Sequence, residues 1–178
     1  MTISEFEGKR PQLGEGTWVH PSADVIGDVR TGSHCWIGPG ARLRGDYGTI
    51  VLGDCCAVED NCVIHARPGE TSTVGAWVTL GHGSIVHSVE RLDDYAVIGM
   101  GAVISDWAQV GVWAVVAEGA VVPQHGAVPD GRIVAGVPAR LLDRPVDEAY
   151  RTAWLGFKQI YVALCDRYRE GYQTDPAE

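Results

Sequence analysis

An aliphatic residue recurs at every sixth position along most of this sequence, beginning at Val19. The repeat is displaced by insertions of three and then four residues, after which it continues in one phase to Val134. An α-helix has apolar residues every three to four positions and a half-exposed strand has them at every second position, so neither element explains a period of six. Short strands joined by tight corners do explain it. The longest uninterrupted series is Val74, Leu80, Val86, Leu92, Ile98, Ile104, Val110, Val116, Val122, Val128 and Val134.

Two other positions of the six-residue repeat support a triangular solenoid. A small residue often lies four positions after the aliphatic one, and glycine often follows it directly. If three repeats form one coil of a prism, the aliphatic side chain fills the interior, the small residue occupies the narrow corner and glycine eases the turn. The small residues include Ala96, Ala102, Ala108, Ala114 and Ala120, and the glycines include Gly38, Gly53, Gly75, Gly81, Gly99 and Gly111.

The period of six does not specify the hand of the coil, and the general preference of parallel crossovers is for the right hand. Over residues 17–139, however, the pattern resembles that of hexapeptide-repeat proteins, which are left-handed β-helices. This resemblance implies an all-β solenoid, a left-handed parallel β-helix. It does not by itself imply one activity, since a single fold carries several chemistries.

A different period begins after the solenoid. Aromatic and aliphatic residues alternate spacings of four and three, which predicts one apolar stripe on an α-helix over residues 147–170. We therefore divide the chain into a β-helix domain with a short N-terminal lead, residues 1–143, and a C-terminal helix and tail, residues 144–178. The final Q-T-D-P-A-E is expected to be a frayed end. The stripe consists of Tyr150, Trp154, Phe157, Tyr161, Leu164 and Tyr168.

Composition excludes several classes of partner. The formal net charge is −9 and no Lys/Arg-rich run occurs, which argues against nucleic acid and anionic membranes as partners. The sequence has neither an apolar N-terminal leader nor an apolar run long enough to span a membrane, so we predict a cytoplasmic protein. The five cysteines include no C-x-x-C pair and are expected to be reduced core residues.

Counting coils places two histidines together. Leu43, Ile64 and Val86 lie three repeats apart once the insertions are removed, so the residues directly after them form one column on adjacent coils. Adjacent coils should be about 4.8 Å apart, which suits two imidazoles that bind one ion at about 2.0 to 2.1 Å. The column consists of Arg44, His65 and His87.

A third histidine, His82, lies five residues before His87, nearly a full prism face away. At about 3.3 Å per residue it should be some 15 Å from the pair, so it cannot complete the same site within one chain. A threefold axis could bring it to the pair of a neighbouring subunit, which predicts a homotrimer with three His₃ sites. Three nitrogen ligands with an open fourth position are typical of catalytic zinc, although iron and cobalt also accept imidazole. His20, His34 and His125 have no such partner and are expected to be exposed turn residues.

Four motifs together resemble the γ-class carbonic anhydrases: L-R-G-D-Y-G at 43–48, V-E-D-N-C-V-I-H at 58–65, V-T-L-G-H-G-S-I-V-H at 78–87 and I-G-M-G-A at 98–102. The resemblance implies that His65, His82 and His87 are the metal ligands. It implies that Arg44, Asp46 and Asp60 form a charged network at the subunit interface beside the metal. The coil counting agrees, since it places Arg44 under His65 and Asp60 one coil below His82. The implied activity is that of a zinc-dependent lyase that hydrates CO₂ reversibly to bicarbonate.

The sequence departs from the family pattern beside the ligands. Glu59 and Ala57 stand where the family commonly has Gln and Asn, and Glu59 could orient the nucleophile or pair with Arg44. The acidic loop after the first ligand is reduced to A-R-P-G-E-T-S-T, in which Glu70 is the one carboxylate. The family contributes a Tyr and an Asn from its terminal helix; this helix contains no Asn, and Tyr161 is the candidate for the Tyr.

Two other functions stay open. Many hexapeptide-repeat trimers transfer acyl groups from CoA with an unligated histidine as general base between subunits, and V-A-G-V-P-A-R at 134–140 is common to both groups. The chain could also bind metal with weak or no hydratase activity, or act on a thioester or other small metabolite.

Overall fold

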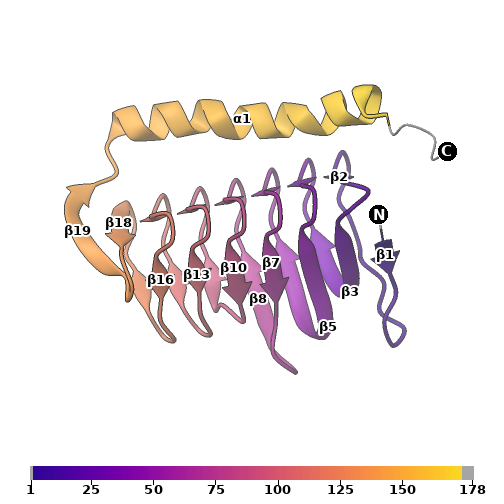
Figure 1. Ribbon diagram of the computed structural model, residues 1–178, viewed down its shortest axis with the longest axis horizontal. Coiled ribbons are helices and arrows are strands. Elements are labelled where there is room, and N and C mark those ends of the chain that lie inside the picture. The colour runs from indigo at the N-terminus through magenta and orange to yellow at the C-terminus, as the bar shows by residue number, and fades with distance from the viewer. Residues whose placement is uncertain (1, 174–178) are drawn as a thin grey trace.

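The computed structural model describes residues 2–173, which form a parallel β-solenoid with one long helix along its side (Figure 1). The coils are stacked along the long axis of the molecule, and the chain runs from β1 at one end to β19 at the other (Figure 1). The predicted fold class, a left-handed β-helix of hexapeptide repeats with a C-terminal helix, is confirmed.

Two sheets form the three faces of the prism. The first contains β1 (Thr2–Ser4), β3 (Asp24–Thr31), β5 (Arg42–Leu52), β7 (Val63–His65), β8 (Thr71–Val74), β10 (Ile85–His87), β11 (Arg91–Leu92), β13 (Val103–Ile104), β14 (Gln109–Val110), β16 (Val121–Val122) and β17 (Ala127–Val128). The second contains β2 (Trp18–Val19), β4 (Trp36–Ile37), β6 (Ala57–Val58), β9 (Thr79–Leu80), β12 (Val97–Ile98), β15 (Val115–Val116), β18 (Arg132–Ala135) and β19 (Arg140–Pro145).

The long strand β5 joins two faces into one sheet. Its first residues pair with β7 and its last residues pair with β8, so the strand continues around a corner of the prism. The strands β7, β10, β13 and β16 therefore form one face, and β8, β11, β14 and β17 form the next. This arrangement places the ends of β7 and β10 side by side.

The aliphatic repeat fills the interior, as predicted. Leu43, Ile64, Ile98 and Ile104 have no exposed surface, and the paired register keeps each column in phase from coil to coil. Burial of these side chains is the main stabilising term, since removing apolar surface from water contributes about 25 cal/mol per Å².

We expect Ile98→Val to lower the free energy of unfolding by about 1 kcal/mol, because deletion of one buried methylene leaves a small cavity in a packed column. Chemical denaturation measures the change. Ile160→Val removes the same group from a helix residue that is 51% exposed, and it should stay within about 0.5 kcal/mol of the wild type. Equal losses in the two variants would contradict an aliphatic core.

The glycines after the aliphatic positions have a different role from the one predicted. They do not adopt the left-handed conformation; instead the next coil lies against them. A Cβ on Gly53 would lie 2.6 Å from the amide nitrogen of Ala76, and one on Gly99 would lie 2.5 Å from that of Glu118. Close approach of neighbouring backbones therefore excludes side chains at these positions. The positive φ angles occur about two residues later in the turn, often at non-glycine residues such as Trp77.

The helix α1 (Glu148–Gly171) begins and ends one residue later than predicted. Asp147 caps its first turn by accepting a hydrogen bond from the backbone N–H of Tyr150. The helix lies along the second sheet and packs against β2, β4 and β6 (Figure 1). Strand β19 precedes it and ends at Pro145, so the β-structure continues two residues past the boundary predicted at 143. Most of the predicted frayed end, residues 174–178, lies outside the described residues.

All five cysteines are free thiols, as predicted. Four of them are buried, and Cys55 is half-buried. Within residues 2–173, no helix is both long and apolar enough to cross a membrane.

Candidate functional site

The predicted column of Arg44, His65 and His87 is present. His65 pairs in register with His87 on one side and with Arg44 on the other. The imidazoles of His65 and His87 end their strands and lie on the outer surface, with ring centroids 5.3 Å apart. The structure thus brings two ligand-type side chains together on adjacent coils.

A carboxylate holds the first ring. Nε2 of His65 lies 3.0 Å from Oδ1 of Asp46, which also accepts the backbone N–H of Tyr47. Arg44 forms an ion pair with the other oxygen of Asp46. Burial lowers the pKa of His65 in spite of the neighbouring Asp46, so the imidazole favours its neutral form. Although burial opposes ionisation of Asp46, the hydrogen bonds from Arg44 and His65 hold its pKa below the usual value.

A second carboxylate, which the sequence analysis missed, holds the other ring. Nδ1 of His87 lies 2.6 Å from Oδ1 of Asp106, a residue that is only 4% exposed. The paired hydrogen bonds from Arg67 hold the pKa of Asp106 well below its usual range. The residue lies 19 positions after His87, one coil of 18 plus one, so the same coil counting could have found it.

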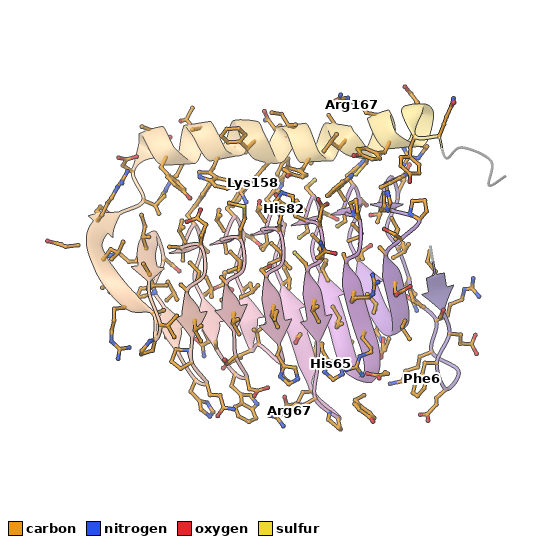
Figure 2. The ribbon with its side chains drawn as sticks, viewed as in Figure 1. Phe6, His65, Arg67, His82, Lys158 and Arg167 are labelled. Atoms are coloured by element: carbon orange, nitrogen blue, oxygen red, sulfur yellow. The ribbon has the colours of Figure 1, made fainter. Side chains whose placement is uncertain are left out.

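His82 lies in the corner between β9 and β10, far from the His65 column (Figure 2). Its Nε2 is 3.1 Å from Oε2 of Glu59, and the backbone N–H of Asp60 donates to its Nδ1 at 3.3 Å. Its side chain is still 46% exposed. Within residues 2–173, no three His, Cys, Asp or Glu side chains converge as a metal site in one chain.

The predicted charged network is divided between the two histidine positions. Arg44 and Asp46 lie beside His65, whereas Asp60 lies beside His82, one coil below it as expected. Glu59, which could have paired with Arg44, pairs with His82 instead and is only 7% exposed. The reason is positional: Glu59 directly follows β6 in the second sheet, one coil below His82, whereas Arg44 lies on β5 in the first sheet.

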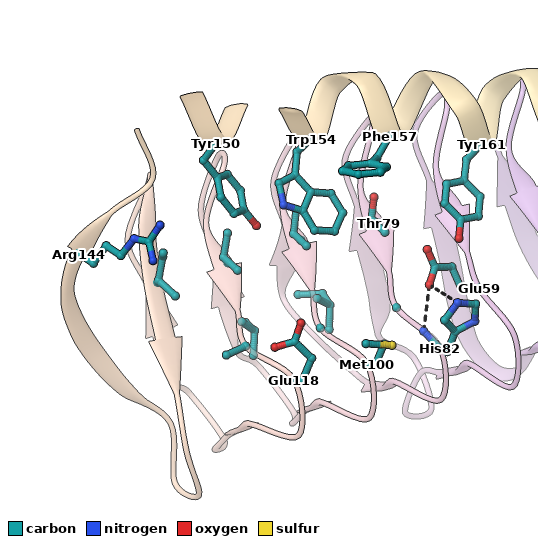
Figure 3. A pocket seen from close by; sticks show the side chains of 18 residues that line it. Glu59, Thr79, His82, Met100, Glu118, Arg144, Tyr150, Trp154, Phe157 and Tyr161 are labelled. Carbon is teal, nitrogen blue, oxygen red and sulfur yellow. Dashed lines mark hydrogen bonds and ion pairs between the residues drawn. The ribbon is translucent and has the colours of Figure 1, made fainter. Parts of the chain in front are cut away.

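A cavity of about 520 Å³ lies between α1 and the coils, next to His82 (Figure 3). Four aromatic side chains from α1 line it, together with aliphatic residues of β12 and β15. Glu59 and His82 lie at one end, and Arg144 lies at the other (Figure 3). The aromatic residues are Tyr150, Trp154, Phe157 and Tyr161.

Tyr161 is close to Glu59 in this cavity, where burial and the carboxylate of Glu59 raise the pKa of its phenol. The candidate aromatic residue of the helix therefore reaches the corner that carries His82. Glu70 lies elsewhere: it accepts hydrogen bonds from the hydroxyl of Ser88 and, at 3.1 Å, from the indole N–H of Trp107. Its two oxygens therefore bind residues that follow β10 and β13, on the next two coils.

The other three histidines are separate from this site. His34 and His125 are exposed turn residues at positive φ, as predicted. His20 is half-buried, which differs from the prediction, because its ring contacts the aromatic ring of Tyr172 and its Nδ1 lies 2.8 Å from the hydroxyl of Ser22.

No protein-family model matches this sequence. Among curated proteins, the chain is similar to the carnitine operon protein CaiE of Salmonella typhimurium, with 36% identity over 177 residues. The alignment covers 99% of this chain and 88% of CaiE.

Among solved structures, the chain is similar to a hexapeptide transferase family protein from Anaplasma phagocytophilum, with a TM-score of 0.87 and 30% identity. That match covers 93% of this chain and 96% of the other. PerB from Caulobacter crescentus, solved in complex with CoA and GDP-perosamine, has a TM-score of 0.62 and 25% identity. The match covers 72% of this chain and 58% of PerB.

Proposed function

This chain belongs to the family of hexapeptide-repeat proteins that includes CaiE, and from that premise we propose that it is a homotrimeric enzyme with three active sites between subunits. Each site would bind a zinc-type metal through His65 and His87 of one subunit and His82 of the partner subunit. The reaction we propose is the reversible hydration of CO₂ to bicarbonate.

The observation that carries this proposal is the register of His65 and His87. Two imidazoles on adjacent coils, with centroids 5.3 Å apart, are close enough to share one ion. A metal ligand must be neutral, and the lowered pKa of His65 favours that form. Each ring is also held by a carboxylate, an arrangement that orients histidine ligands in metal sites.

An apolar column beside these histidines supports the trimer. Val63, Ile85, Val103 and Val121 pair in register and point outward on the face of β7, β10, β13 and β16. Ile85 is 41% exposed, and α1 covers the other sheet rather than this face. A second copy of the chain that covers this column would bury apolar surface and bring its own corner histidine toward His65 and His87.

A zinc-type ion, when bound, lowers the pKa of water to near 7 and so supplies a nucleophile for CO₂ at neutral pH. The residues of the chain would do the rest. Asp46 and Asp106 would hold the two rings, and Glu59, whose carboxylate lies beside His82, could accept the proton that the attacking water loses.

Acyl transfer from CoA is a second candidate, and specific observations favour it. His87 and Asp106 form a dyad that suits a general base, if Nε2 of His87 carries no metal. The 520 Å³ cavity beside His82 is much larger than CO₂ requires and is mainly apolar, as suits an acyl-bearing substrate. The solved complex of PerB with CoA adds to the case for this candidate.

Two measurements on the purified protein separate these functions. Metal analysis of the trimer should give about one zinc, iron or cobalt per chain, and stopped-flow assays should show CO₂ hydration above the buffer rate. Acetyl-CoA consumption with a panel of amine acceptors is measured in parallel. A metal-free protein that consumes acetyl-CoA would establish the transferase, and a metal-loaded trimer at the buffer rate would exclude the hydratase.

We expect Glu59→Gln to strengthen metal binding roughly fivefold, because a neutral amide holds His82 less tightly than a carboxylate does. If His82 binds the metal through Nε2, its contact with the side chain of residue 59 must break first. Competition with a chelator measures the affinity. Glu118→Gln, which removes the other carboxylate of the same cavity, should leave the affinity unchanged. Weaker binding by Glu59→Gln would show instead that Glu59 stabilises the ligated state.

A further inference from the structure

We propose that Asp106 is a positioning residue, which fixes the tautomer of His87 so that the lone pair on Nε2 faces the site. The functional role of this positioning rests on the proposed function, because both a metal ligand and a general base require an unprotonated Nε2 on His87. The geometry that leads to it stands independently of which chemistry follows.

Apart from His87, every side-chain partner of Asp106 is a donor. Oδ1 lies 2.6 Å from Nδ1 of His87 and accepts from Nε of Arg67 at 2.9 Å. Oδ2 accepts from Nη2 of Arg67 at 2.9 Å and from Nε2 of Gln124 at 3.0 Å. A guanidinium can only donate, so both oxygens of Asp106 act as acceptors. The nitrogen of His87 that faces Asp106 must then carry the proton, and Nε2 keeps the lone pair.

The carboxylate is also braced against rotation from three separate parts of the chain. Arg67 lies in the loop after β7, His87 ends β10, and Gln124 follows β16. The guanidinium of Arg67 lies over the ring of Trp107 at 5.4 Å, and the indole N–H of Trp107 is held by Glu70. Because Asp106 is 4% exposed, water offers little competition for these contacts.

The same network explains why the short loop after His65 carries an arginine and a glutamate. Arg67 fixes Asp106 directly, and Glu70 fixes the indole on which Arg67 stacks. His65 is held differently, since Asp46 contacts its Nε2 rather than its Nδ1. The two histidines of the column are therefore oriented by separate carboxylates through different ring nitrogens.

The test is the tautomer of His87 in metal-free trimer, measured by long-range ¹H–¹⁵N NMR with the resonance assigned from a His87→Gln variant. The wild type should show a proton on Nδ1. Asp106→Asn should shift the population toward the Nε2–H tautomer, because the side-chain oxygen stays with Arg67 and the amide N–H₂ turns to His87. Metal affinity should fall about 10- to 100-fold. Asp143 is an exposed carboxylate on β19. Asp143→Asn changes the charge by the same amount and should leave the His87 tautomer and the metal affinity unchanged.

A wild-type His87 with its proton on Nε2 would overturn the proposal, and that result needs no variant to fold. An Asp106→Asn trimer that keeps both the Nδ1–H tautomer and wild-type affinity would overturn it as well. A wild type that binds no metal refutes the metal-dependent function alone, because the NMR measurement still decides whether Asp106 sets the tautomer.

Discussion

Replacing His87 with alanine is expected to lower both metal affinity and kcat/KM for CO₂ hydration by more than about 100-fold. Mutation of a residue that only orients a metal ligand typically lowers metal affinity or activity about 10- to 100-fold, so removal of a ligand itself should lower them further. Chelator competition and stopped-flow hydration measure the two losses. His34→Ala removes an exposed corner histidine and should match the wild type. Hydration at the wild-type rate in His87→Ala would exclude the proposed chemistry.

Mixing two inactive variants tests whether the site is shared between subunits. His82→Ala should be as defective as His87→Ala, although His82 lies in the corner before β10 and His87 lies at the far end of that strand. A site in a randomly mixed trimer works only if His65 and His87 come from a His82→Ala subunit and His82 comes from a His87→Ala subunit. About a quarter of the sites should therefore recover activity. No recovery after confirmed subunit exchange would contradict a site between subunits.

The stability of the wild type relative to Lys158→Met is expected to rise with pH between about 7 and 10. Lys158 is 2% exposed, and its Nζ donates to the carbonyl of Trp77 at 2.6 Å and to the hydroxyl of Thr79 at 2.9 Å. Burial lowers the pKa of Lys158 to about 7. Between that value and about 10.4 the unfolded chain binds a proton that the folded chain lacks, so raising the pH opposes unfolding by up to about 1.4 kcal/mol per unit. Below pH 7 both states are protonated and the slope vanishes.

Urea denaturation at pH 7, 8 and 9 compares wild type with Lys158→Met. The stability of the wild type relative to the variant should increase at each step. Lys9→Met serves as the control, because Lys9 is 57% exposed and is the other lysine of the chain. If the free energies of unfolding of wild type and Lys158→Met differ by the same amount at each pH, Lys158 remains protonated where it is buried between α1 and the second sheet.

The sequence by itself determined the solenoid, the helix and the histidine pair. These features depend on periodicity: one aliphatic residue in six must be buried, and once that burial holds, residues 18 apart must stack. Ile64 and Val86 face the interior, so His65 and His87 must face outward together. The same logic correctly placed Asp60 beside His82.

Only the tertiary structure decided which side chains hold these residues in place. Arg67 and Asp106 are 39 residues apart and meet because the side chain of Arg67 reaches from the loop after β7 to the turn after β13, a contact that hexad counting does not predict. Glu59 pairs with His82 rather than Arg44 because a corner separates the two faces. The burial of Lys158 depends on how α1 lies on the second sheet. Periodicity specifies which residues are buried and stacked, whereas hydrogen bonds between side chains depend on distances that arise only when loops and helix pack.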